Sequence, residues 1–416
     1  MSLIKNSFWN LAGYLIPTII AIPALGYIAR ILKPELFGIY TLAIAIVGYA
    51  GIFDIGLTRA IVREIALNRN DLQERKKIIS TSTIFIVVFS SCGITCLYFF
   101  LPQIVRLLNV SAEHSVDVIN SLTILIFSIP IFLLNQLWMS ILEGDEKFAI
   151  LNLQRSIGSS VIAGFPALFL YINATLEYAI LGLFIGRLFS LIISFLMVKQ
   201  EIFRAKFVFS LLTFKRLVFF GGWITISNII SPVMVYFDRF IISNISGARA
   251  VGFYTAPSEA ISRLGLIPGA LSRAVFPRLS NSLHSGDFNK QLLISYKLMI
   301  IGCLPLVILG SYYANEILNV WMGEEYATHS ANVLVILLVG FFFNSLAQIP
   351  FTAIQSLGKA KITAFIHCVE ILPYLFLLYY SVKEYGVLGA AFAWSIRVIV
   401  DFILLFFISR KIINRQ

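Results

Sequence analysis

Twelve apolar stretches, each long enough to cross a bilayer as a helix, constrain the fold of this chain more than any other feature. A transmembrane helix needs about 20 consecutive apolar residues. Hydrophobic residues make up 59% of the chain and charged residues 13%, against about 25% charged residues in soluble proteins. The sequence therefore predicts an all-α polytopic membrane protein. The twelve expected crossings are residues 8–32, 37–58, 78–101, 118–141, 151–172, 178–198, 217–243, 250–276, 292–313, 331–355, 362–382 and 387–409.

The connections between these stretches are short, and none exceeds 20 residues. This disfavours membrane glycosyltransferases and polysaccharide polymerases, which generally carry their chemistry on a large external loop. The sequence contains no Gly-x4-Gly-Lys phosphate loop, no serine nucleophile elbow and no metal-spaced cluster of histidine and cysteine. The first apolar stretch is too long for a cleavable signal peptide. We therefore expect a protein that is not an enzyme, with no cofactor and no metal site.

Lysine and arginine residues gather on alternate loops. With the N-terminus placed in the cytoplasm, the inner loops and tails hold 23 of the 32 Lys and Arg residues, and the outer loops hold five. Positive residues accumulate on the cytoplasmic loops of membrane proteins, so we predict that both termini are cytoplasmic. The net charge of +11 then largely reflects topology. Because the basic residues are spread over many short loops, no nucleic-acid partner is expected.

The two halves of the chain resemble each other at a constant offset of 214 residues. This predicts two parallel six-helix repeats around a central cavity, as in carriers that work by alternating access. We expect an N-terminal lobe over 1–200, a cytoplasmic linker over 201–216 and a C-terminal lobe over 217–416. A duplicated bundle that serves as a scaffold is the alternative. The matching pairs are Trp9 and Trp223, Gly38 and Gly252, Tyr40 and Tyr254, Arg59 and Arg273, Gly144 and Gly358, and, with one outer loop shortened by seven residues, Gly182 and Gly389.

Proline residues within the expected crossings mark sites where a helix can bend, because each removes a backbone hydrogen bond. Two closely spaced pairs are the best candidates for bending elements. These are Pro17 with Pro23 in the first crossing and Pro257 with Pro268 in the eighth.

We assign eight acidic and basic residues to the membrane interior rather than to the loops or the membrane boundary. Each costs at least about 2.5 kcal/mol at a lipid-facing helix centre, so they should face one another or a cavity. Residues four apart share a helix face, so Arg397 can pair with Asp401, and Glu259 with Arg263. Arg187 has no acid within one helical turn. The eight residues are Arg187, Arg239, Arg263, Arg397, Asp238, Glu259, Glu370 and Asp401.

Two interpretations of these charges remain open. In the first, acids and bases neutralise each other and lock the helices together. In the second, arginines line a central cavity and bind an anionic head group, because the guanidinium fork matches phosphate oxygens. The candidate substrate-binding residues are Arg30, Arg187, Arg239, Arg263 and Arg397, and the candidates for ion coupling are Asp238, Glu259, His367, Glu370 and Asp401.

Several short motifs, in order and spacing, resemble those of the multidrug/oligosaccharidyl-lipid/polysaccharide exporter superfamily. Within it, the chain resembles the polysaccharide-transporter branch, the Wzx-type O-antigen flippases, over nearly its whole length. The motifs are Ser7-Phe8-Trp9-Asn10, Arg30 ahead of Leu36-Phe37-Gly38-Ile39-Tyr40, Asp54-Ile55-Gly56-Leu57 before Arg63, Tyr236-Phe237-Asp238-Arg239-Phe240 and Val251-Gly252-Phe253-Tyr254.

The resemblance implies a flippase that moves an undecaprenyl-pyrophosphate-linked oligosaccharide from the cytoplasmic to the periplasmic leaflet of a bacterial inner membrane. It also implies a cation-lined cavity. Separately, we expect any energy input to come from a gradient of H+ or Na+, and we expect contact with membrane lipid. A polysaccharide polymerase and a chain-length regulator are possible further partners. The alternatives are a small-molecule or multidrug exporter of the same superfamily and a non-transporting scaffold of the assembly complex. Drug exporters often place a coupling carboxylate on the first helix, and the first crossing here has none.

Overall fold

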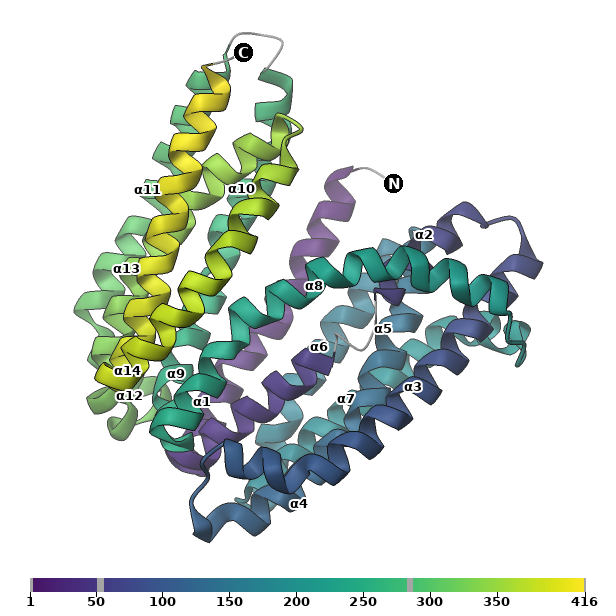
Figure 1. Cartoon of the computed structure of the whole chain (residues 1–416), viewed down its shortest axis with the longest axis horizontal. Helices are drawn as coiled ribbons and strands as arrows, with labels where there is room; N and C mark the ends of the chain where they lie inside the picture. The colour runs from purple at the N-terminus through teal and green to yellow at the C-terminus, as the bar shows by residue number, and fades with distance from the viewer. Residues whose placement is uncertain (1–2, 51–55, 283–286, 415–416) are drawn as a thin grey trace. The chain divides into compact units, whose positions relative to one another are not determined.

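The computed structural model describes residues 3–50, 56–282 and 287–414 and is drawn in Figure 1. Its regular elements are α-helices and one short 3-10 helix, which confirms the all-α prediction for the described residues. Of the motif residues, Asp54 and Ile55 lie outside them. The helices are α1 (Leu3–Ala50), α2 (Leu57–Leu67), α3 (Leu72–Leu107), η2 (Ala112–His114), α4 (Ser115–Ile126), α5 (Ser128–Gly144), α6 (Phe148–Ile172), α7 (Leu176–Ala205), α8 (Leu211–Ser246), α9 (Ala248–Leu264), α10 (Leu266–Ser282), α11 (Phe288–Tyr312), α12 (Ala314–Met322), α13 (Glu324–Ser356) and α14 (Ala360–Ile413).

All twelve predicted crossings overlap these helices. The first two fall on α1 and the last two on α14, while the fourth is divided between α4 and α5 and the eighth between α9 and α10. Within the described ranges, eight helical stretches are long and apolar enough to span a membrane, with α1 and α14 each counted once. α9 and α10 are not among them, because each has 17 residues. The helix set is thus compatible with twelve crossings, and the polytopic prediction is confirmed.

The helix breaks follow the repeat. Lys33 interrupts α1 with φ 62 and ψ 169, and Pro34 favours this break because proline disfavours the α region for the residue before it. Gly247, which is 214 residues further on, precedes α9 with φ 86 and ψ 164. The first and second crossings of each half therefore join at equivalent residues. α14 has a comparable break at Gly386, with φ 57.

The proline pairs do not coincide with all of these breaks. Pro17 and Pro23 lie inside α1, where Lys33 is the residue with non-helical backbone angles. A bend at Pro17 and Pro23 stays a prediction, since a proline can curve a helix without leaving the helical region of φ and ψ. In the eighth crossing, α9 and α10 meet at Gly265, which lies between Pro257 and Pro268.

Backbone contacts divide the chain into two units, Met1–Phe237 and Asp238–Gln416. The division falls inside α8, because the start of this helix packs against the first unit. Arg216, for example, lies 3.0 Å from Glu64 and 3.1 Å from Glu74. A lobe boundary in the linker over 201–216 stays a prediction.

Close helix packing within each unit depends on matched glycines. On α7, a Cβ at Gly182 would lie 2.7 Å from the carbonyl oxygen of Phe165 on α6. At its repeat equivalent, Gly389, a Cβ would overlap the carbonyl oxygen of Ser381, which lies on the other side of the α14 break. The absence of a side chain therefore lets the last two crossings of each half pack closely.

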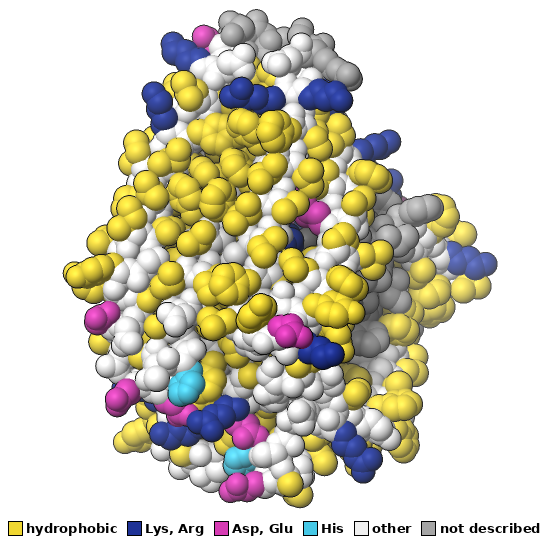
Figure 2. Space-filling model, turned by 60° about the vertical axis from the view of Figure 1, so that its left-hand side comes forward, with side chains coloured by type: hydrophobic (Ala, Val, Ile, Leu, Met, Phe, Trp, Pro, Cys, Tyr) yellow, Lys and Arg dark blue, Asp and Glu magenta, His cyan; other side chains and the backbone are white. Residues whose placement is uncertain are grey.

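One face of the molecule carries many exposed apolar side chains. On the face drawn in Figure 2, hydrophobic side chains lie between an upper end marked by lysine and arginine and a lower end where acidic, basic and histidine side chains lie together. Exposed residues of α11 and α14 such as Ile301, Phe365, Leu372 and Phe407 are unfavourable in water but stable against lipid. This arrangement suits a protein that spans a bilayer.

At one end of the first unit, a buried ion pair ties three helices together. The Arg75 guanidinium on α3 lies 2.7 Å from one Asp145 oxygen and 3.1 Å from the other, and 3.3 Å from Glu201 on α7. Lys147 adds a contact of 3.0 Å to Asp145. Partial burial raises the pKa of Asp145, but hydrogen bonds from Arg75 and Lys147 lower it by more, so this pKa lies below its ordinary value.

Replacing Asp145 with asparagine should therefore destabilise the protein at neutral pH. Removing one partner of a buried pair costs about 3 kcal/mol. Because the folded-state pKa is lowered, the stabilisation exists above the ordinary aspartate pKa of about 3.9 and disappears as the pH falls through the folded-state pKa. Thermal unfolding in detergent should show a large difference between the variant and the wild type at pH 7, shrinking in acid.

The neighbouring Glu146 provides the control, because its pair with Arg69 at 2.8 Å is largely exposed. Glu146→Gln should change the free energy of unfolding by less than about 1 kcal/mol. If Asp145→Asn and Glu146→Gln lowered the free energy of unfolding equally, the buried Arg75–Asp145 pair would not stabilise the fold more than the exposed pair does.

Candidate functional site

Arg187 is a buried base in the first unit, held on α7. It is 8% exposed, and its Nη1 donates a hydrogen bond of 2.6 Å to the Ser128 hydroxyl. Its guanidinium carbon lies 5.9 Å from the centre of the Phe132 ring. Ser128 begins α5, directly after the residue that separates this helix from α4. The contacts of Arg187 with described residues are thus to a hydroxyl and an aromatic ring, and no described carboxylate compensates its positive charge.

A neutral polar network lies one and two turns further along α7. The Gln154 side-chain amide on α6 donates to the Ser190 and Ser194 hydroxyls at 3.0 and 2.7 Å. Ser194 in turn donates to the Asn135 side-chain oxygen on α5 at 2.6 Å. Sequence reasoning missed this network, because it considered charged residues alone; the spacing of Ser190 and Ser194 by four was an available signal.

In the second unit, two arginines share one glutamate. Arg239 lies 2.9 Å from one oxygen of Glu259, and Arg263 lies 3.6 Å from the other. This confirms that Glu259 and Arg263 can meet on one helix face and adds Arg239 to the pair. Asp238 accepts a hydrogen bond of 2.6 Å from the Tyr254 hydroxyl, a partner that sequence reasoning missed. The two acids and two bases balance, so this group has no net formal charge.

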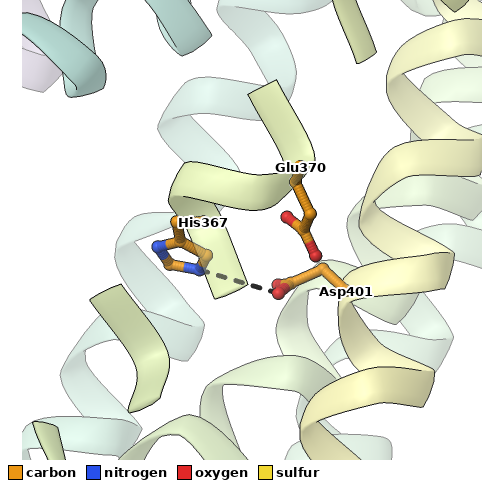
Figure 3. Close-up of side chains that lie close together, drawn as sticks. All are labelled: His367, Glu370 and Asp401. Atoms are coloured by element: carbon orange, nitrogen blue, oxygen red, sulfur yellow. Dashed lines mark ion pairs between the residues drawn. The ribbon is translucent and has the colours of Figure 1, made fainter. Parts of the chain in front are cut away.

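A second group of ionisable residues lies on the two parts of α14, as Figure 3 shows. His367, Glu370 and Asp401 offer ligand atoms that all lie within 4.8 Å of one another. His367 Nε2 is 3.6 Å from Asp401 Oδ1, and Arg397 Nε is 4.0 Å from Glu370 Oε2. Arg397 also lies over the Tyr374 ring, at 5.5 Å.

These contacts correct one expected pair. Arg397 and Asp401 are four residues apart on one helix, but within the described part of the chain Arg397 is near Glu370 and Asp401 is near His367. The break at Gly386 brings the two parts of α14 together, and contacts between the parts replace the contact along the helix. The spacing of His367 and Glu370 by three correctly indicated that these two lie together.

The second group has an excess of negative charge. With His367 neutral, one base faces two acids, which leaves a formal charge of −1. Both Glu370 oxygens and one Asp401 oxygen are buried and have no hydrogen-bond partner among the described residues. A buried carboxylate without a hydrogen-bond partner destabilises the folded protein unless it is protonated, binds a cation or accepts a hydrogen bond from water.

The repeat relates this group to the neutral network of the first unit. The offset of 207 that matches Gly182 with Gly389 also matches Ser190 with Arg397 and Ser194 with Asp401. Equivalent positions thus carry hydroxyls in one half and charges in the other. Arg30, the remaining candidate substrate-binding residue, is exposed on α1. The structure therefore separates a buried positive site in the first unit from a buried negative site in the second.

Comparison with known proteins identifies relatives along the whole chain. A family model described as polysaccharide biosynthesis protein matches residues 3–283. A Shigella flexneri protein, named as a candidate O-antigen transporter, is 56% identical over 405 residues that cover 97% of each chain. An Escherichia coli (strain K12) protein of the same name is 25% identical over 339 residues, covering 79% of this chain and 75% of its own.

Two solved structures share the fold. Lipid II flippase MurJ, in an inward closed conformation, has a TM-score of 0.81 and 19% identity, covering 96% of this chain and 87% of its own. An inward-facing multidrug resistance transporter of the MATE family, in the MOP superfamily, has a TM-score of 0.80 and 15% identity, covering 98% of each chain. The expected superfamily fold is thereby confirmed, and the match over residues 3–283 together with the 56% identical relative shows that the chain belongs to the polysaccharide biosynthesis protein family.

Proposed function

We propose that the chain is a flippase for undecaprenyl-pyrophosphate-linked O-antigen units in a bacterial inner membrane. The observation that carries this proposal is the 56% identity, over 97% of both chains, to the Shigella flexneri protein named for O-antigen transport. The many buried charges, which a simple scaffold does not need, favour transport over a structural role.

The positive site supports recognition of the pyrophosphate. A buried guanidinium whose described partners are a hydroxyl and an aromatic ring is stabilised by a phosphate oxygen, which accepts charge-assisted hydrogen bonds. Arg187 is therefore the leading substrate-binding residue in this proposal. Arg263 and Arg239 share Glu259 and contribute less. Arg30, which is exposed on α1, and Arg397 complete the proposed binding set.

The negative site supports coupling to an ion gradient. Glu370 and Asp401, with His367 beside them, can take up a proton or a small cation, which would neutralise their excess charge. Asp238 and Glu259 are weaker candidates, because Tyr254 and two arginines already satisfy them. In this proposal, ion uptake in the second unit and head-group binding in the first favour different states of an alternating-access cycle.

The proposed cycle has both termini in the cytoplasm. The two lobes open a central cavity to the cytoplasmic side, accept the oligosaccharide and pyrophosphate, and leave the lipid tail in the bilayer. The opposite opening then presents the head group to the periplasm. A polysaccharide polymerase and a chain-length regulator are proposed to act on the product on that side.

Reconstitution tests this proposal directly. The purified full chain, in vesicles loaded with a lipid-linked oligosaccharide, should increase the fraction of head groups reached by an external, membrane-impermeant lectin. Protein-free vesicles and Arg187→Ala vesicles are the controls. If the wild-type protein moves no lipid-linked sugar, the chain is a scaffold of the assembly complex. Drug sensitivity with intact surface sugars after deletion of the gene would instead identify a small-molecule exporter.

A further inference from the structure

The segment that joins the two halves is fixed to the first unit rather than loose. It comprises the end of α7, the turn after it and the start of α8, and we call residues 199–219 the linker surface. The Val208 and Ser210 N–H groups donate hydrogen bonds of 2.7 and 3.1 Å to the hydroxyls of Ser80 and Thr81, which are buried on α3. With the Arg216 contacts to Glu64 and Glu74, these bonds hold the segment beside α3 (Figure 1).

The outward side of the linker surface carries large apolar side chains. Phe203 is 71% exposed, Phe207 92%, Leu212 78% and Phe219 76%. Single exposed apolar residues are common, but a run of this size on an ordered segment indicates a partner surface. The inward residue Phe214 instead packs against Phe85 of α3, with ring centres 5.0 Å apart, so the segment has an inner and an outer side.

Basic residues lie among these apolar side chains. Lys199, Arg204, Lys206 and Lys215 are all exposed. In the described part of the chain, none of the four lies within 4.0 Å of a carboxylate, whereas the neighbouring Arg75 and Arg216 each contact two acids. The unit thus uses its inner bases in ion pairs and leaves these four available for external anions.

We propose that the linker surface binds the bilayer surface, with its phenylalanine and leucine side chains between the acyl chains and its four bases on anionic phospholipid head groups. The segment follows directly from the membrane-spanning helix α7, which places it at the bilayer boundary. Aromatic residues beside lysine and arginine match that boundary, where an apolar interior meets anionic head groups. The proposal depends on the membrane fold and not on which substrate is carried.

Spin labels on the outer side test the proposal. We would attach nitroxides at Phe207→Cys and, separately, Leu212→Cys in the full chain with Cys92, Cys96, Cys303 and Cys368 replaced by alanine. Each variant is reconstituted in phosphatidylcholine vesicles with and without phosphatidylglycerol. Both labels should collide more with oxygen than with a water-soluble nickel chelate, and this ratio should rise when phosphatidylglycerol is present.

Charge removal and a nearby water-exposed position are the controls. Lys206→Gln with Lys215→Gln removes two of the four bases and should reduce the effect of phosphatidylglycerol at both labels. A label at Glu146→Cys should stay accessible to nickel in both vesicles. Three results would overturn the proposal: nickel accessibility at 207 and 212, as for a soluble partner; equal oxygen-to-nickel ratios in both vesicles; or dipolar broadening that shows a second copy on this surface.

Discussion

Replacing Arg187 with alanine is expected to abolish O-antigen display at the cell surface while leaving the amount of protein in the membrane unchanged. The described partners of this buried base are neutral, so its removal leaves no buried carboxylate uncompensated. The effect should therefore fall on binding rather than on folding. Each charge-assisted hydrogen bond contributes about 1.5–3 kcal/mol, which corresponds to about 10- to 100-fold in affinity for the pyrophosphate group.

Two further variants separate binding from a structural role. Ser128→Ala removes the hydroxyl that accepts from Arg187 but keeps the guanidinium, and should leave display largely intact. Arg187→Lys keeps the charge but loses the planar fork, and should restore display partly. The measurement is a surface polysaccharide blot with a parallel blot for the protein. Equal loss of display from Ser128→Ala and Arg187→Ala would mean that Arg187 supports the junction of α4 and α5 instead.

Arg263 should be less sensitive than Arg187. Its guanidinium is partly exposed and lies 3.6 Å from Glu259, which also binds Arg239. After Arg263→Ala, Glu259 therefore keeps a basic partner, and the substrate loses a base that was already partly neutralised. In the same blot, we expect reduced rather than absent display from this variant.

The helical architecture was predictable from the sequence because a helix that crosses the bilayer needs apolar side chains along its whole length. Each crossing needs a long apolar stretch, so hydropathy alone predicted ranges that all overlap the observed helices, although the fourth and eighth ranges are each divided between two helices. The break at Lys33 could also have been anticipated, since Pro34 follows it, and the offset of 214 then points to Gly247.

The pairing of charges was harder to predict, because it depends on contacts between helices. Spacing by four indicated a bond between Arg397 and Asp401, but the fold at Gly386 brings Glu370 and His367 to them from the preceding crossing. Residue spacing predicts contacts along one helix, and it does not show whether a residue on a neighbouring helix lies closer. The neutral network around Gln154 was missed for a related reason. Its amides and hydroxyls lie on three different helices, so the hydrogen bonds between them can be recognised in the folded structure but not in the sequence.

Replacing Glu370 with glutamine is expected to remove the response of transport to an ion gradient. The group of Glu370, Asp401, Arg397 and His367 carries a formal charge of −1 with neutral histidine, and this substitution brings it to zero. Without the excess charge, uptake of a proton or cation is no longer favoured. A tenfold proton gradient supplies about 1.4 kcal/mol per proton, so wild-type vesicles should accumulate flipped lipid up to about tenfold more with the gradient than without it.

The variant should flip lipid at its basal rate whether or not the gradient is present, because Arg187 and the rest of the proposed head-group site are unchanged. Glu384→Gln is the matched control, since Glu384 is an exposed acid on the same helix, and it should respond as the wild type does. Loss of basal flipping in Glu370→Gln, together with a lower melting temperature, would assign Glu370 a structural role as the partner of Arg397. An undiminished gradient response would place coupling elsewhere, with Asp238 and Glu259 next to be tested.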